Sequence, residues 1–104
     1  MSEYSFEREA RTPYSEVFTI ESDDGTDVGR VDLHYTPSIT YATLCISEGL
    51  TEEDVQDLIG QIDERLVMTS DPYREDFIVT VWTGRETGVY SDEGDDEDEG
   101  NEEP

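Results

Sequence analysis

The stretch of residues 39–66, ITYATLCISEGLTEEDVQDLIGQIDERL, decides the fold, because it joins a strand pattern directly to a helix pattern. In residues 39–47 apolar side chains fall on alternate positions, with Ala42, Leu44 and Ile46 on one face, and such alternation is typical of a strand. From residue 51 onward the apolar residues follow helical spacing and form one stripe, made of Val55, Leu58, Ile59, Ile62 and Leu66. We therefore expect a strand that leads into an amphipathic helix.

The start and the end of this helix carry recognisable signals. Thr51 is a favourable N-cap, and the acidic residues 52–54 suit the positive end of the helix dipole. The spacing from Thr51 to Asp54 approximates a capping box, and Leu50 and Val55 stand at the two positions of a hydrophobic staple. The Asp-Pro pair at residues 71–72 ends the helix. Gly60 costs helix stability, and it indicates either a tolerant surface or the close approach of a partner.

Three further strands flank this stretch. Residues 14–22 and 28–36 alternate in the same way and are joined by DDGTD, a short polar run with glycine that suits a hairpin loop. Residues 76–83, DFIVTVWT, carry apolar side chains on both faces, which favours a central position in the sheet. After Gly84, a turn at residues 85–88 leads to Val89 and Tyr90, which can pair back as a short fifth strand.

We predict an α+β fold in the order β-β-β-α-β, an antiparallel-rich sheet of four to five strands with one amphipathic helix. Residues 14–91 form the single domain, and residues 1–13 are a polar N-terminal arm that is either a short edge strand or a loose segment. The strand at 76–83 runs parallel to those at 14–22 and 39–47, so it can lie beside either.

Acidic residues dominate the charge of the chain. The 104 residues include 29 Asp and Glu against six arginines, with no lysine, for a net charge of -23. Residues 92–104 hold nine of these acids and no large apolar residue, so we predict a disordered acidic tail. A net charge of -14 remains on residues 1–91. This composition resembles that of proteins from salt-in halophiles, in which concentrated salt screens the repulsion between carboxylates.

The composition also excludes several classes of protein. A chain of this length is one small domain, and its shortage of basic residues argues against direct binding of nucleic acid or of anionic membranes. The N-terminal residues lack the apolar core of a signal peptide, and no window suits a membrane span, so we expect a cytoplasmic protein. Cys45 is the only cysteine, which rules out an intramolecular disulfide and a Cys-based zinc cage.

Candidate catalytic and metal-binding residues are few. His34 is the only histidine, and it shares the polar face of its strand with Arg30 and Asp32, which indicates a solvated residue more than a general base. Cys45 lies in a strand between Leu44 and Ile46, and we expect a buried small hydrophobe rather than a reactive thiol, which needs a helix N-terminus or a neighbouring cation. The DDGTD run lacks the spacing of a calcium loop, and the acidic approach to the helix would repel phosphate. We predict no catalytic residue, no metal and no cofactor.

One predicted surface stands out. The face of the sheet opposite the helix collects Val17, Ile39, Tyr41, Cys45, Ile78 and Trp82. One helix cannot cover both faces, and aromatic residues are favoured anchors of interfaces, so we expect Val17, Ile39, Tyr41, Ile78 and Trp82 to bind a partner. The alternative is cover from within the chain, either by the N-terminal arm with Tyr4 and Phe6 or by Val89 and Tyr90.

These observations favour a small acidic, non-catalytic module that binds a protein, basic in character, or a second copy of itself through this apolar face. Two alternatives come from other classes. The carboxylates would suit a nucleic-acid mimic that neutralises a toxin or an enzyme, and His34 with a carboxylate would suit a small enzyme.

Overall fold

The computed structural model describes residues 3–70 and 74–92 of the chain, and it confirms the predicted α+β class. One mixed sheet and one helical segment follow in the order β-β-β-β-α-β. The elements are β1 (Ser5–Thr12), β2 (Ser15–Glu21), β3 (Asp27–Tyr35), β4 (Ile39–Ile46), α1 (Glu52–Ile62), a π-helical turn (Asp63–Val67), α2 (Met68–Ser70) and β5 (Asp76–Thr83).

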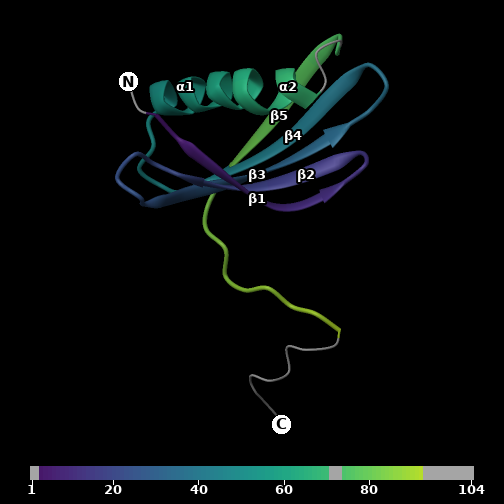
Figure 1. Cartoon of the computed structure of the whole chain (residues 1–104). Coiled ribbons are helices and arrows are strands. Elements are labelled where there is room, and N and C mark those ends of the chain that lie inside the picture. The colour runs from purple at the N-terminus through teal and green to yellow at the C-terminus, as the bar shows by residue number, and fades with distance from the viewer. Residues whose placement is uncertain (1–2, 71–73, 93–104) are drawn as a thin grey trace.

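The five strands lie side by side in the order of the sequence. Neighbouring strands from β1 to β4 pair antiparallel, whereas β5 pairs parallel with β4. The helical segment crosses one face of the sheet, and the chain leaves the other side after β5 (Figure 1). Because the connection from β4 to β5 runs through this helix, the two strands point the same way, and of the two places open to the last strand β5 takes the one beside β4.

The N-terminal arm is a strand of the sheet. Residues 5–12 form β1 at one edge, where Phe6 pairs with Ile20, and a bulge interrupts the pairing between Arg8 and Ala10. Tyr4 is buried in the core on the helix side. Tyr4 and Phe6 therefore do not cover the opposite face. The fifth strand predicted at Val89 and Tyr90 is wrong, since the segment after β5 has no strand geometry and both side chains are strongly exposed.

The position predicted for residues 76–83 is wrong too. β5 is an edge strand, with β4 on one side and no further strand on the other within the described part of the chain. Its apolar pattern indicated burial on both faces, yet Ile78, Val81 and Trp82 are all exposed. An edge strand has only one neighbour to cover its side chains, and the helix shields only part of its inner face.

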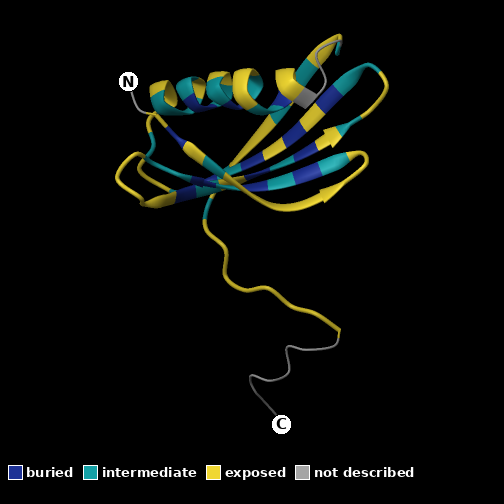
Figure 2. Cartoon of the chain, in the orientation of Figure 1, coloured by how far each residue is buried: buried dark blue, intermediate teal, exposed yellow. Residues whose placement is uncertain are grey.

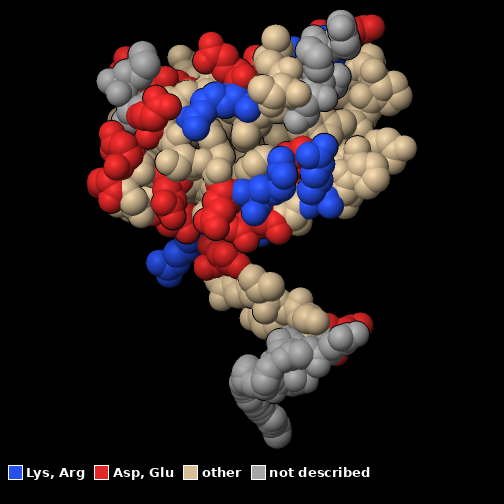
Figure 3. All heavy atoms as spheres, viewed as in Figure 1, with Lys and Arg blue, Asp and Glu red and all other residues tan. Residues whose placement is uncertain are grey.

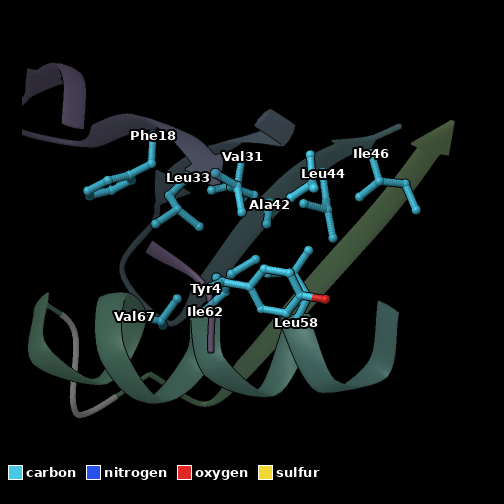
Figure 4. Close-up of a cluster of buried hydrophobic side chains, with 12 residues drawn as sticks. Tyr4, Phe18, Val31, Leu33, Ala42, Leu44, Ile46, Leu58, Ile62 and Val67 are labelled. Carbon is cyan, nitrogen blue, oxygen red and sulfur yellow. The ribbon is translucent and has the colours of Figure 1, made fainter. Parts of the chain in front are cut away.

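A single hydrophobic core fills the space between sheet and helix. Side chains of β2, β3 and β4 point toward the helix, and Tyr4 packs among them (Figure 4). Buried residues alternate with partly buried or exposed ones along these strands, and α1 is exposed on its outer side (Figure 2). The fully buried apolar residues of the described chain are Ile20, Val31, Leu33, Leu44, Leu58, Ile62 and Val67.

The helix begins as predicted and changes register near its end. Thr51 and Asp54 form the capping box, in which the Asp54 N–H donates to the Thr51 hydroxyl over 3.1 Å. Within the π-helical turn the chain needs an extra residue per turn, so Val67 is buried where the regular stripe predicted Leu66, which is only half-buried. Gly60 is exposed, and a Cβ there would meet nothing within 4 Å.

Arginines fasten β1 to the rest of the fold. The Arg65 guanidinium donates to the carbonyl of Tyr4 over 2.5 Å and lies 4.9 Å above the centre of the Phe6 ring. Glu16 on β2 is only 2% exposed, and the Nε atoms of Arg8 and Arg11 each lie 3.6 Å from its carboxylate. A buried carboxylate needs such compensation, because its desolvation is costly.

Candidate functional site

The sheet surface opposite α1 is the candidate site, and we call it the open face. It consists of alternate residues from Ser15 to Thr19 on β2, from Arg30 to His34 on β3, from Ile39 to Cys45 on β4 and from Ile78 to Trp82 on β5. The strand registers place all five predicted partner-binding residues on this face. No helix of the described residues covers it, since α1 and α2 lie on the other side (Figure 1).

The predicted residues do not form one continuous patch. Tyr41 pairs with Ile78 in the register, and Ile39 lies two residues before Tyr41 on the same strand. Trp82 lies farther along β5, beside Cys45. The exposed fractions are 43% for Tyr41, 41% for Ile78 and 61% for Trp82. The apolar surface thus concentrates on β4 and β5, the parallel pair at one edge.

Val17 stands apart from the others. It lies on β2 opposite Asp32, and the next residues along that row are Thr43 and Thr80. Polar groups also occupy the centre of the face, where the Arg30 Nε donates to the Asp32 carboxylate over 3.0 Å. A ligand on the open face would therefore meet an apolar margin and a polar centre.

A groove of about 950 Å³ runs along the open face beside the segment that follows β5. Val17, Thr19, Arg30 and Cys45 are among its lining residues on the sheet, and Val89 lines it from the C-terminal segment. The groove is open, and Val89 itself remains strongly exposed, so the segment forms one wall and does not cover the face.

His34 is exposed on the open face, between Ser15 and Tyr41 of the neighbouring strands. The polar groups near it have other partners: the Ser15 hydroxyl bonds the Thr12 hydroxyl over 2.7 Å, and the Asp32 carboxylate accepts from Arg30. These contacts do not connect a nucleophile or an orienting carboxylate to the imidazole. Cys45 is half-buried on the same face rather than buried as the sequence indicated.

The DDGTD loop between β2 and β3 is a turn held by hydrogen bonds to its own side chains. The Asp24 carboxylate accepts hydrogen bonds from the Ser22 hydroxyl and from the Thr26 N–H, the latter over 3.0 Å. Gly25 takes a positive φ of 87° at the tip. The hydrogen bonds from Ser22 and Thr26 hold the pKa of Asp24 below its ordinary value.

Among residues 3–70 and 74–92, no group of three or more His, Cys, Asp or Glu side chains is placed to hold a metal ion. In the same part of the chain no helix has the length and apolar character needed to cross a membrane. The predicted acidic tail, apart from Asp92, lies outside the described residues.

Sequence reasoning missed two features. Glu16 occupies the core side of β2, and the signal was present, because Glu16, Phe18 and Ile20 alternate on one face. The exposed edge of β5 was missed because a strand with apolar residues on both faces is typical of the centre of a sheet.

The carboxylates are spread unevenly over the surface. In the view of Figure 3, the end of the sheet that carries the β1–β2 and β3–β4 turns is largely uncharged.

Comparison with protein-family models, with curated proteins and with solved structures found no match to the chain. Its function therefore has to be inferred from its own residues and their geometry.

Proposed function

We propose that this chain is a non-catalytic module that binds another protein, or a second copy of itself, through the β4–β5 side of the open face. Tyr41, Ile78 and Trp82 would be the anchors, and Ile39 would extend the contact. Half-buried Val17 would contribute at the far side of the polar centre.

The observation that carries the proposal is the joint exposure of Tyr41, Ile78 and Trp82 on two neighbouring strands of one face. In a chain with a net charge of -23, large apolar side chains left together in water are costly unless something covers them. Tyr and Trp are also enriched among the residues that contribute most to binding. The acidic character of the chain as a whole would steer a basic protein toward it and speed association.

The test is the double substitution Tyr41→Ala and Trp82→Ala. We expect it to abolish a complex captured from the native host and reconstituted from purified components, while circular dichroism shows an unchanged fold. Both side chains lie outside the core, so their loss should leave stability nearly unaffected.

A matched control is available in the same chain. Tyr14 and Tyr90 are exposed aromatic residues that lie outside the four strands forming the open face. Their double replacement by alanine removes similar apolar surface from elsewhere and should leave binding intact. Binding retained by the Tyr41→Ala, Trp82→Ala protein in its folded state would contradict the proposal.

A nucleic-acid mimic remains the second candidate, because carboxylates gather along the outer side of α1. Asp57, Asp63 and Glu64 line a shallow groove there together with Glu3. This function predicts competition with DNA or RNA for a basic enzyme, and a complex that salt weakens strongly. Folding that occurs only in concentrated KCl, followed by circular dichroism, would instead favour salt adaptation as the reason for the charge.

The proposal includes a cytoplasmic setting, in which neither nucleic acid nor a membrane is the direct ligand. Its support is the shortage of basic residues, since phosphate backbones and anionic lipids are bound by clustered Lys and Arg.

A further inference from the structure

The two edges of the sheet differ in their protection. β1 carries Glu7, Arg8, Glu9 and Arg11 and is broken by a bulge, and charges and bulges are the usual means of blocking an edge. β5 has no charged residue from Phe77 to Thr83, no proline and no register shift in its pairing with β4. It is the kind of edge to which another strand can add.

Apolar exposure on β5 occurs on both faces of the sheet. Ile78 and Trp82 point to the open face, whereas Val81 belongs to the helix side and is still 40% exposed. A partner lying flat on the open face would cover the first two and leave Val81 in water. A strand added beside β5 would cover all three, because side chains of paired strands contact their neighbours on both faces.

The backbone of β5 also has hydrogen-bonding groups available on its outer side. The Gly84 N–H donates to the Ile46 carbonyl over 2.8 Å, toward β4. Backbone groups alternate along a strand, so those of Val79, Val81 and Thr83 point away from β4. The Phe77 N–H follows this alternation, since it bonds the neighbouring Asp76 carboxylate over 2.7 Å instead of a β4 carbonyl.

We propose that the outer edge of β5 pairs antiparallel with β5 of a second copy of the chain, centred on Thr80, to join two sheets into one of ten strands. This inference rests on the proposed function, since it names the occupant and the edge that it uses. The alternation of the backbone allows only registers that pair odd residues with odd ones. In the register centred on Thr80, Val79 hydrogen-bonds Val81 of the other copy. The Phe77 carbonyl accepts from the Thr83 N–H of that copy, since the Phe77 N–H already bonds Asp76.

This register is complementary in side chains and in charge. On the open face it sets Ile78 against Trp82 of the second copy, twice by symmetry. It leaves Asp76 opposite Gly84, outside the uncharged run. Glu75 precedes β5 and Arg85 follows it, and both are exposed. The antiparallel order brings the end of β5 that carries Glu75 near the end of the other copy that carries Arg85, so an acidic and a basic residue flank the neutral strip at each end.

Salt has opposite effects on the two kinds of partner. Two copies of net charge -23 repel each other outside the neutral strip, and salt screens that repulsion. Self-association should therefore strengthen as KCl is raised, whereas a complex with a basic protein weakens. This difference separates the second copy from a basic occupant of the same edge.

The first test measures molar mass by light scattering after size exclusion, from dilute to concentrated KCl, on the full chain. We expect the fraction of dimer to increase with the KCl concentration. Val81→Lys should raise the dissociation constant of the dimer by at least about tenfold, since each copy then places a charge against Val79 of the other. Thr43→Lys is the matched control. It puts the same charge at an exposed site one strand inward, where an edge dimer leaves it in water, so the dimer should persist.

The second test reads the register by oxidation in a Cys45→Ser background. In this register Thr80 of one copy lies directly opposite Thr80 of the second copy, in a pair whose backbones do not hydrogen-bond each other. The Cα atoms of such a pair lie about 4.5 Å apart, which is close enough for a disulfide between cysteines. Thr80→Cys should therefore give a covalent dimer, and Thr43→Cys, its neighbour on β4, should not. Ile78→Cys mixed with Trp82→Cys should cross-link as a heterodimer.

Each contrary result overturns the edge pairing: a folded chain that stays monomeric at every KCl concentration, a Val81→Lys protein that dimerises like the parent, or cross-linking through residue 43 instead of 80. The proposed function fails separately. A monomeric chain whose partner is lost with Tyr41→Ala and Trp82→Ala would refute the edge dimer alone. An edge dimer in a chain whose other partner ignores that double substitution would refute binding through the open face alone.

Discussion

Replacement of Gly29 by alanine should destabilise the fold through a single backbone contact. A Cβ at this position on β3 would lie 2.3 Å from the carbonyl oxygen of Cys45 and 3.1 Å from the Cα of Ile46. Carbon and oxygen atoms normally approach to about 3.3 Å or more, so β3 and β4 would have to separate locally by about 1 Å. Backbone shifts of this kind cost about 1–3 kcal/mol, a substantial part of the 5–15 kcal/mol (roughly) that stabilises a small domain.

The same substitution at Gly60 should change the free energy of unfolding in the opposite direction. A Cβ there meets nothing within 4 Å and lies on the exposed side of α1, so Gly60→Ala should stabilise the helix by about 1 kcal/mol. Both substitutions restrict the unfolded chain alike. The difference of about 2–4 kcal/mol between the variants therefore reports the folded environments alone.

The assay is urea unfolding followed by circular dichroism, at one KCl concentration in which all variants are folded. A Gly29→Ala protein as stable as the parent, or a Gly60→Ala protein with a lower free energy of unfolding, would contradict these expectations. Measuring binding by the Gly60→Ala protein distinguishes the two interpretations of Gly60, a tolerant surface or the close approach of a partner. If it marks the close approach of a partner, Gly60→Ala weakens the complex even though it stabilises the helix; on a tolerant surface it leaves binding unchanged.

Three other predictions follow from single contacts. Arg65→Ala should cost about 1–2 kcal/mol, because a partly exposed charged hydrogen bond to the N-terminal strand is lost, and hydrogen exchange should show β1 opening first. Val67→Ala should lower the free energy of unfolding by about 2 kcal/mol. In thermal unfolding it should destabilise the protein more than Leu66→Ala does, whereas a regular helix would make Leu66 the more important of the two. The pKa of Asp24 is lowered chiefly by the Ser22 hydroxyl, so its ionised form stabilises the fold above the ordinary value of 3.8. The parent protein should therefore be more stable than Asp24→Asn above this pH, and the difference in the free energy of unfolding should disappear as pH falls through the lowered pKa. A difference that persists or increases in acid would contradict this prediction.

Local signals in the sequence were sufficient for most of the architecture. Alternation placed β2, β3, β4 and β5 within about two residues of their observed ends, and the polar DDGTD run marked the hairpin between β2 and β3. Thr51 and Asp54 predicted the capping box because capping depends on residues three apart, which the sequence displays directly.

The misses all depend on contacts between distant residues. Nothing local to Leu66 reveals a π-helical turn that buries Val67 in its place, because that turn responds to the packing of the helix on the sheet. The sequence allows residues 1–13 to be either an edge strand or a loose arm, because their pairing with β2 is accompanied by ion pairs from Arg8 and Arg11 to Glu16, whose burial depends on the packing of the whole sheet. The open face was predictable from alternation, but its division into an apolar margin and a polar centre required the strand order.

The charge of the chain and its unprotected edge explain each other. An uncharged edge strand such as β5 invites uncontrolled pairing, and proteins usually block it with charges on the strand itself. Here the carboxylates lie elsewhere on the chain, and at low ionic strength their mutual repulsion keeps copies apart over distances longer than any contact. As salt rises this long-range protection fades while the apolar pairing of Ile78 with Trp82 persists. The proposed dimer would then form at high ionic strength, without a blocking charge on β5.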